Sequence, residues 1–398
     1  MGLNETASGQ RVHIGFFGLR NSGKSSLVNR ITGQEMSLVS DVAGTTTDPV
    51  KKAMELLPIG PVVIVDTPGF DDEGMLGRMR VEKTREILRR TDIAVLVTDA
   101  SRDLVESEKE MIEVFIERKL PYIVVFNKAD LVPEPDSVTD NGIYVSALDG
   151  KNIDELKELI GKTAGREEEK RIIGDILQRG DNVVLVVPVD ESAPKGRLIL
   201  PQQQTIRDIL DSGCTAYICQ PGELEGVLEN LKDKPAAVVT DSQAFEKVAE
   251  TVPEDIPLTS FSILFARYKG ELGILAEGAA ALAKLKDKDR VLVSEGCTHH
   301  RQCNDIGTVK IPGWVREYCG KDISFDFTSG NSFPDNLCEY ALNIHCGGCM
   351  LNEKEMKYRI RVCTESGVPV VNYGMAIAKM HGIFERSIEL FKDELRAE

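Results

Sequence analysis

Residues 18–25 read Gly18-Leu19-Arg20-Asn21-Ser22-Gly23-Lys24-Ser25, which fits the pattern G-x-x-x-x-G-K-S. The apolar run His13–Gly18 predicts a strand before this loop, and Lys24–Ile31 predicts a helix after it. In that setting, backbone N–H groups of the loop and of the helix N-terminus cradle phosphate groups. We expect Lys24 to contact the β- and γ-phosphates of a nucleotide, and the Ser25 hydroxyl to reach Mg²⁺. The other expected contacts from this loop come from Asn21, Ser22, Gly23 and Ser26.

Two further segments complete the expected phosphate and magnesium site. Asp66-Thr67-Pro68-Gly69 ends an apolar run. We expect Asp66 to hold Mg²⁺ through a water molecule and the Gly69 N–H to contact the γ-phosphate. Residues 44–48 read Gly-Thr-Thr-Thr-Asp and form the expected switch segment. There Thr46 is the expected Mg²⁺ ligand and Thr45 is the alternative. The expected catalytic residues are Lys24, Thr46, Asp66, Gly69 and Asn21.

The preference for guanine comes from two later segments. Asn127-Lys128-Ala129-Asp130 follows an apolar run, and Ser146-Ala147 comes after it in the order expected of a base pocket. The Asp130 carboxylate can accept two hydrogen bonds from the guanine edge, which adenine cannot supply. Backbone donors at Ser146 and Ala147 complete the pocket. These motifs in this order predict binding of GTP or GDP with Mg²⁺, and GTP hydrolysis.

Alternating strands and helices predict an α/β protein of three domains. A chain of 398 residues is too long for one ordinary core. The first domain, residues 1–165, has apolar strands typical of a mostly parallel sheet at Val62–Asp66, Ile93–Asp99 and Tyr122–Asn127, and a closing helix at Asn152–Ile160. A small α/β domain without catalytic or metal-type spacing follows at residues 166–260. We interpret it as an assembly module.

The third domain, residues 261–398, contains seven of the nine cysteines. Its expected helices are the long, alanine-rich Ser262–Lys286, then Asn352–Glu365 and Ala376–Leu395; its expected strands are Arg290–Ser294, Leu342–Ile344 and Val368–Asn372. Two of these strands end just before cysteine motifs. Open α/β sheets place their ligands beyond such carboxyl ends.

The two motifs are Cys297-Thr298-His299 and His345-Cys346-Gly347-Gly348-Cys349. Three thiolates with an imidazole suit a closed zinc site. They equally suit a 4Fe-4S cluster with one corner that is not a cysteine, and spacing alone does not choose between the two. Cys346 and Cys349 alone also resemble a redox pair. We interpret the remaining cysteines as structural: Cys214, Cys219, Cys303, Cys319, Cys338 and Cys363.

Composition limits the possible partners. The net charge is −16, and no basic stripe interleaved with aromatic residues occurs, which argues against a nucleic-acid partner. No apolar run has membrane-spanning length, and no secretory signal is evident, so we expect no membrane association. Nine cysteines without such a signal favour a reducing, cytoplasmic location.

The N-terminal motifs resemble the GTPases of the TrmE–Era group. In this chain Phe70 follows Asp66–Gly69, so the water-positioning glutamine of Ras-type enzymes is missing and slow intrinsic hydrolysis is expected. Asn21 stands where potassium-activated members of that group carry an asparagine that ligates K⁺. The resemblance therefore implies that K⁺ stimulates hydrolysis.

A GTPase followed by C-x-H and then H-C-x-x-C resembles the HydF family of FeFe-hydrogenase maturation GTPases, over essentially the whole chain. The resemblance implies a homodimer with a GTPase domain, a dimerisation domain and a cluster-binding domain. It also implies a 4Fe-4S cluster on Cys297, Cys346 and Cys349, with His299, His345 or an exchangeable group as the fourth ligand.

The function implied by the same resemblance is that of a scaffold and carrier. Such a protein receives a transient di-iron precursor from radical-SAM maturases and passes it to apo FeFe-hydrogenase. The alternatives are an RNA- or ribosome-directed GTPase with a zinc module, and a Cys-x-x-Cys redox protein.

Overall fold

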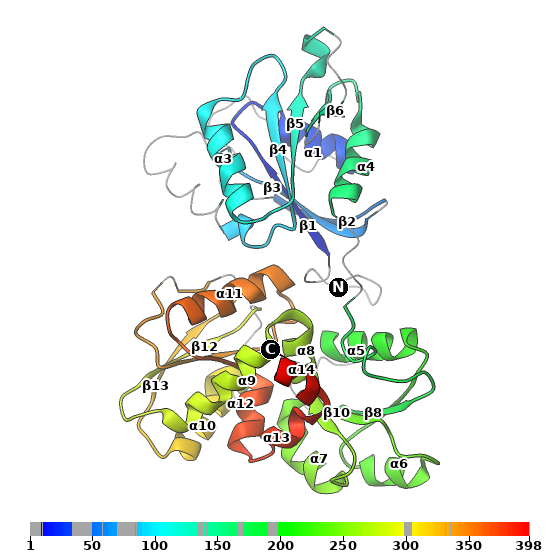
Figure 1. Ribbon diagram of the computed structural model, residues 1–398, viewed down its shortest axis with the longest axis vertical. Helices are drawn as coiled ribbons and strands as arrows, with labels where there is room; N and C mark the ends of the chain where they lie inside the picture. The colour runs from blue at the N-terminus through cyan, green and yellow to red at the C-terminus, as the bar shows by residue number, and fades with distance from the viewer. Residues whose placement is uncertain are drawn as a thin grey trace. The chain divides into compact units, whose positions relative to one another are not determined.

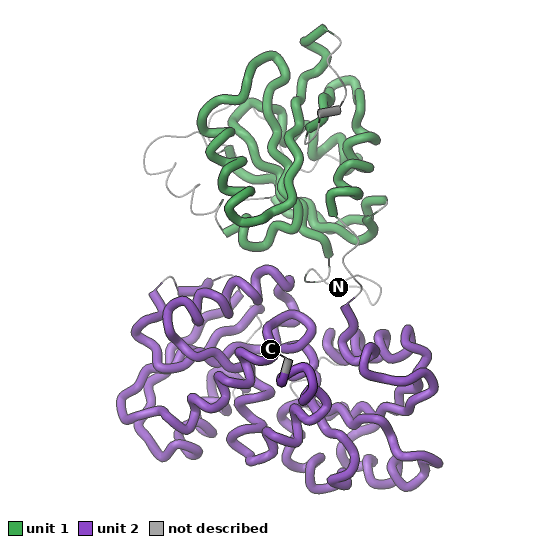
Figure 2. The backbone as a smooth tube through the Cα atoms, viewed as in Figure 1, with its two compact units in different colours: residues 1–169 green, residues 170–398 purple. Residues whose placement is uncertain are grey.

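The computed structural model describes residues 9, 11–33, 50–57, 59–69, 84, 86–133, 138–139, 142–164, 170–189, 198–297, 305–330, 332–334 and 336–397. The chain divides into two compact units, residues 1–169 and residues 170–398 (Figure 2). In the described residues, no helix combines the length and the apolar character needed to cross a bilayer.

Unit 1 is a seven-stranded sheet in the order β2-β3-β1-β4-β5-β7-β6, with helices on both faces (Figure 1). The central strands run parallel, and the edge strands β2 and β6 pair antiparallel. The predicted α/β class with a mostly parallel sheet is therefore confirmed. The elements are β1 Val12–Phe17, α1 Lys24–Thr32, β2 Val50–Leu56, β3 Gly60–Asp66, β4 Ile93–Asp99, α3 Glu106–Glu117, β5 Tyr122–Asn127, β6 Val138–Thr139, β7 Gly142–Tyr144 and α4 Ile153–Thr163.

Each face of this sheet has its own hydrophobic core. Ile14 and Phe16 of β1 pack toward α1 and α4. Phe17, the next residue along, packs on the opposite face against Phe115 of α3, with ring centroids 5.5 Å apart. Because both faces are covered, the strands are apolar throughout, which is why they were recognisable as continuous apolar runs.

Unit 2 contains two four-stranded parallel sheets, in the orders β11-β10-β8-β9 and β13-β12-β14-β15. The strands are β8 Asn182–Val186, β9 Thr215–Cys219, β10 Ala237–Thr240, β11 Leu258–Ser260, β12 Arg290–Ser294, β13 Ser324–Thr328, β14 Leu342–His345 and β15 Val370–Asn372. The helices are α5 Leu200–Asp211, α6 Leu224–Asn230, α7 Phe245–Thr251, α8 Phe261–Lys269, α9 Leu272–Ala279, α10 Ile311–Cys319, α11 Glu353–Glu365, α12 Tyr373–Met380, α13 Phe384–Ser387 and α14 Lys392–Ala397.

One continuous hydrophobic core joins the two sheets of unit 2. Helix α8 contacts β11 of the first sheet and β15 of the second. The expected boundary between residues 260 and 261 falls where β11 passes directly into α8, inside this unit.

Two predictions of long helices are wrong. The expected helix Ser262–Lys286 is broken into α8, α9 and the 3₁₀ turn Ala280–Lys284. At the first break Gly270 is extended, and a Cβ there would lie 2.7 Å from the Ala266 carbonyl oxygen. The expected helix Ala376–Leu395 is interrupted after α12, where Gly382 adopts a left-handed conformation with φ 74° that ends a helix.

Helix α11 carries a charged pair in its buried face. The side chains of Arg359 and Glu355 are 1% and 2% exposed, and their Nε and Oε1 atoms lie 2.9 Å apart. Arg359 also donates to the Gly330 carbonyl oxygen at 2.7 Å. On the same helix, Arg361 and Glu365 form a pair with the same spacing in sequence, but these side chains are 64% and 68% exposed.

We expect Arg359→Met to lower the free energy of unfolding by about 3–5 kcal/mol, because it leaves the Glu355 carboxylate buried without its partner. The matched control Arg361→Met should cost less than about 0.5 kcal/mol, because its pair is solvated. Urea titration followed by Trp314 fluorescence measures both, since Trp314 is the single tryptophan and lies in unit 2. Equal losses in the two variants would contradict the assignment of a buried pair.

Candidate functional site

The phosphate-binding loop connects β1 to α1, as the motif requires. Gly23, the last residue before α1, adopts φ 83°. The Asn127 side chain donates from Nδ2 to the Ser22 carbonyl oxygen at 3.0 Å. A Cβ on Gly23 would lie 2.2 Å from that same nitrogen. A glycine is therefore required here both by the left-handed backbone and by the approach of Asn127.

Two of the expected magnesium residues, Ser25 near the start of α1 and Asp66 at the end of β3, lie together. The Ser25 hydroxyl donates to Asp66 Oδ2 at 2.7 Å. Register explains this proximity, because Phe16 of β1 pairs with Asp66 at the end of β3. A hydroxyl and a buried carboxylate form an oxygen donor set that fits Mg²⁺. Lys24, the first residue of α1, directly precedes Ser25, and its side chain is buried.

The expected base pocket is joined by side-chain hydrogen bonds. Ser146 Oγ donates to Asp130 Oδ1 at 2.7 Å, and the Ala147 N–H donates to Asn127 Oδ1 at 3.1 Å. Asn127 therefore links the phosphate loop to the base segment. These contacts place the two predicted base motifs at one end of the sheet.

Lys128 pairs with Asp99 rather than remaining solvated. Its Nζ lies 2.6 Å from Asp99 Oδ2, and β4 and β5 bring the two together through the register Asp99 to Asn127. Burial alone would raise the pKa of Asp99, but hydrogen bonds from Lys128 and Ser101 lower it to about 2. The Asp99 carboxylate is therefore charged at neutral pH. The sequence analysis did not identify Asp99, which merely ends an apolar strand.

The other predicted nucleotide residues are placed as follows. Asn21 is exposed in the loop with a left-handed backbone, φ 62°. Ser26 lies in the first turn of α1, and Gly69 lies three residues beyond the end of β3. Thr45, Thr46 and the predicted switch segment lie outside the described residues.

The two cysteine motifs meet at the carboxyl edge of one sheet. Strands β12 and β14 are parallel neighbours, with Ser294 opposite His345. The N–H of Gly296, next to Cys297, donates to Cys346 Sγ at 3.1 Å. The Gly348 N–H also approaches this sulfur, at 3.4 Å. The residue that precedes the first motif is thus hydrogen-bonded to the second motif, although the two are far apart in sequence.

The three thiols are partly buried, and their thiolate forms would repel one another. Burial, followed by the nearby Cys346 and Cys349 sulfurs, raises the pKa of Cys297 to about 12. Burial likewise raises the pKa of Cys346 to about 11. It also raises the pKa of Cys349 above its ordinary value. Without a metal these groups are neutral thiols at pH 7. A cationic centre that displaces the protons would stabilise the thiolates.

Among the residues that the structure describes, no group of three or more His, Cys, Asp or Glu side chains is arranged to hold a metal ion. His299 and Cys303 lie outside those residues. Of the cysteines interpreted as structural, Cys214, Cys219 and Cys363 are buried, whereas Cys338 is exposed.

His345 is buried and both of its ring nitrogens have partners. Nδ1 lies 2.7 Å from the Cys346 carbonyl oxygen, and Nε2 lies 3.2 Å from Arg359 Nη1. A guanidinium only donates, so Nε2 accepts, and Nδ1 carries the proton and donates to the carbonyl. Burial, and then the charge of Arg359, lower the pKa of His345 to about 3. In this arrangement His345 supports the backbone at Cys346 and has no free nitrogen for a metal.

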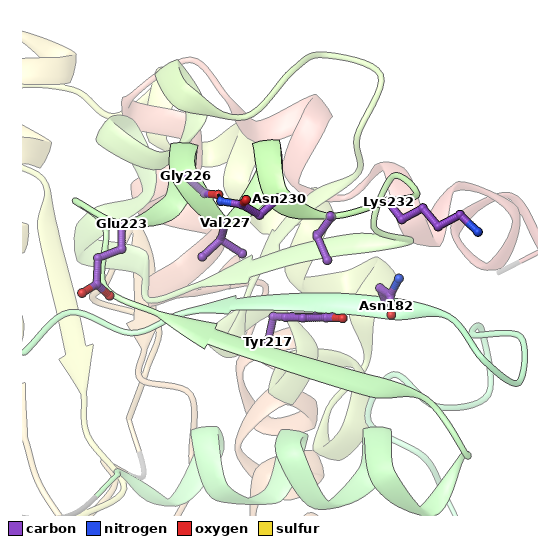
Figure 3. Close-up of a pocket in the computed structure, with 8 residues that line it drawn as sticks. Asn182, Tyr217, Glu223, Gly226, Val227, Asn230 and Lys232 are labelled. Carbon is purple, nitrogen blue, oxygen red and sulfur yellow. Dashed lines mark hydrogen bonds between the residues drawn. The ribbon is translucent and has the colours of Figure 1, made fainter.

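One pocket of about 470 Å³ lies between α6 and β9 (Figure 3). Tyr217 of β9, Asn182 of β8 and Asn230 of α6 contribute to its lining. None of the residues that line it belongs to a predicted motif. The pocket therefore adds nothing to the nucleotide or cysteine sites.

Three family models match consecutive parts of the chain. Residues 13–128 match the model described as a 50S ribosome-binding GTPase. Residues 172–270 match the hydrogen maturase F dimerization domain, and residues 273–390 match the hydrogen maturase F tetramerization domain. The two hydrogen maturase F models together span more than half of the chain.

The N-terminal part is similar to known GTPases. The tRNA modification GTPase MnmE of Nitrosomonas europaea is 33% identical over 153 residues, which are 37% of this chain and 34% of that protein. MnmE of Aquifex aeolicus is 33% identical over 165 residues, 40% of this chain and 36% of that protein. The chain thus spans about a third of the length of the curated relatives it matches.

Solved structures with similar folds include Era of Aquifex aeolicus, at 21% identity and a TM-score of 0.36 over 52% of this chain and 92% of that one. The G domain of FeoB from T. maritima is 21% identical, with a TM-score of 0.31 over 39% of this chain and 99% of that one. The motifs, the MnmE relatives and the GTPase model make the N-terminal domain a GTPase. Residues 172–270 and 273–390 both match hydrogen maturase F models, so the chain belongs to the hydrogen maturase F (HydF) family.

Proposed function

We propose that this GTPase is a cytoplasmic scaffold that holds a 4Fe-4S cluster and delivers a di-iron precursor to apo FeFe-hydrogenase. The precursor would come from radical-SAM maturases. The observation that carries the proposal is the hydrogen bond from the N–H of Gly296, the residue before Cys297, to Cys346 Sγ at the carboxyl edge of one sheet. GTP hydrolysis by itself has no use for three partly buried thiols in this part of the chain.

The thiols fit an iron–sulfur cluster better than a single ion. A cluster spreads its ligands over separate irons, so three thiolates with one open corner can hold it. N–H donors to Cys346 Sγ stabilise a thiolate there. When bound, the cluster supplies an iron corner that the three thiolates of Cys297, Cys346 and Cys349 leave open to cargo.

The fourth ligand is proposed to be absent or exchangeable. Both nitrogens of His345 are engaged by Cys346 and Arg359, so His345 supports the loop instead of closing the cluster. His299 remains the other candidate and lies outside the described residues. A corner without a fourth thiolate suits transfer, because cargo can leave without breaking an Fe–thiolate bond of the protein.

We propose that the carrier works as a homodimer. Its matching models are described as dimerization and tetramerization domains, which supports self-association. Strand β9 lies at the edge of its sheet, with Tyr217 39% and Ile218 49% exposed. An edge strand with exposed apolar side chains is suited to pairing with a second chain.

We expect anaerobically purified protein to be brown, with about four irons per chain and thiolate-to-iron absorption. Cys297→Ser should lose most of the iron, because it removes one of three thiolates, whereas Cys338→Ser, at an exposed cysteine outside the motifs, should keep it. Light scattering on the same sample should give a mass above the 43.8 kDa of one chain. Zinc at one ion per chain, or a metal-free Cys346–Cys349 disulfide, would exclude the cluster.

K⁺ stimulation is proposed from Asn21, which is exposed in the phosphate loop. GTP hydrolysis should be at least about tenfold faster in K⁺ than in Na⁺, since an arginine finger of comparable charge contributes about a thousandfold or more. Asn21→Ala should remove the difference between the salts. Phosphate release under saturating GTP measures both. Equal rates of the wild type in the two salts would refute a potassium site.

We propose that the nucleotide gates partner binding or release. Lys24→Ala should keep its iron, because unit 2 holds the cysteines, but should lose nucleotide binding and at least about 90% of the hydrogenase activity that it confers. The assay is hydrogen evolution by apo-hydrogenase after incubation with protein from cells that express the maturases. If the variant matures hydrogenase as well as the wild type, the nucleotide has no part in transfer.

A further inference from the structure

Lys269 is a buried lysine directed at the cysteine loop. It is the last residue of α8 and is 2% exposed. Its Nζ lies 3.3 Å from the Gly348 carbonyl oxygen, 3.0 Å from that of Cys349 and 2.8 Å from that of Leu351. All three acceptors belong to the turn that carries Cys349, so one side chain from a distant helix holds this turn together.

The number of acceptors matches the charged form of the side chain. An ammonium has three N–H groups, and each finds a carbonyl oxygen here. A neutral amine has only two and would leave one carbonyl of the turn without this donor. The geometry is therefore that of a buried cation.

A buried cation needs a counter-charge, and the carbonyl groups do not supply one. The acidic groups that act on Lys269 are Cys349, Cys346 and Glu353. Glu353 is already paired with Lys170 at 2.5 Å and with Lys357 at 2.9 Å. Among the described residues, the charge left to balance Lys269 is that of Cys346 and Cys349, which become thiolates only when a bound metal centre displaces their protons.

We propose that Lys269 is a positioning residue for the metal cluster: its hydrogen bonds to three carbonyl groups hold the Cys346–Leu351 turn in the metal-free protein, and its charge offsets the negative charge of the cluster once the cluster binds. The proposal rests on the proposed cluster function. It also links two parts of the chain, because Lys269 lies in the segment that matches the dimerization model and the turn lies in the segment that matches the tetramerization model.

The charge of Lys269 affects the reduction potential of the proposed cluster. Three thiolates give a cluster a net negative charge, and reduction adds one more electron. A nearby buried cation stabilises the reduced form, so it raises the potential, which depends on net charge and hydrogen bonding around the sulfurs. Removing the cation should lower the potential, whereas a residue with only a packing role would not shift it in a charge-dependent way.

The test compares Lys269→Met, Lys269→Gln and the control Lys284→Met in the full-length chain. Lys284 is an exposed lysine in the 3₁₀ turn Ala280–Lys284. Hydrogen exchange of the amides of residues 346–351 is measured on metal-free protein. The reduction potential is measured by dye-mediated titration of the cluster-loaded protein.

In Lys269→Met, exchange should be at least about tenfold faster, because hydrogen bonds to a charged donor are lost. Its cluster potential should be more negative than that of the wild type. Lys269→Gln keeps two N–H donors without the charge. Its amide exchange should therefore be faster than that of the wild type and slower than that of Lys269→Met. Its cluster potential should be lowered as much as that of Lys269→Met. Lys284→Met should match the wild type in both measurements.

Exchange and potential equal to those of the wild type in both Lys269 variants would overturn the proposal. If Lys269→Met does not fold, Lys269→Gln decides the result, because it fills the same space with a polar group. A wild-type protein that holds no iron would end the proposed cluster function. The exchange measurement on the metal-free protein would still decide whether Lys269 shapes the turn.

Discussion

Parallel pairing of neighbouring strands is the constraint on which both sites depend. Parallel strands end at the same edge of a sheet, so residues that follow them meet there however far apart they are in sequence. In unit 2 the pairing of β12 with β14 brings Gly296 to Cys346, 50 positions away. In unit 1 the pairing of β1 with β3 brings Asp66 to the loop that carries Ser25.

Buried charged side chains hold the turn that carries Cys346 and Cys349. Two buried cations support the Cys346–Leu351 turn: Lys269 contacts its carbonyl groups directly, and Arg359 acts through the neutral His345. The Arg359 charge is offset by Glu355, whereas no carboxylate of the described residues forms an ion pair with Lys269. The turn is therefore shaped by polar contacts, and its electrostatic balance is completed only when the sulfurs carry negative charge.

Local patterns made the nucleotide site and most strands predictable. The bounds of β4, β5 and β12 agree with the predicted ones because each contains a continuous apolar run. The two long helices were not predictable, because their apolar pattern continues through Gly270 and Gly382, and only the backbone conformation there ends them. Lys269 was missed for a related reason. A lysine at a helix end is usually solvated, and its partners here lie about 80 positions away.

His345 shows why a motif does not by itself identify a metal ligand. Its place beside Cys346 suggested an imidazole for the metal, but strand β14 directs the ring toward α11, where Arg359 occupies Nε2. The other nitrogen is committed to the Cys346 carbonyl, so rotating the ring toward a metal would break two buried hydrogen bonds and leave Arg359 short of a partner. A histidine held in this way keeps the backbone of the turn in place, and in the proposed cluster it would leave one iron corner to an exchangeable ligand. An open corner is what the proposed carrier needs, since a fourth bond from the protein would compete with its cargo.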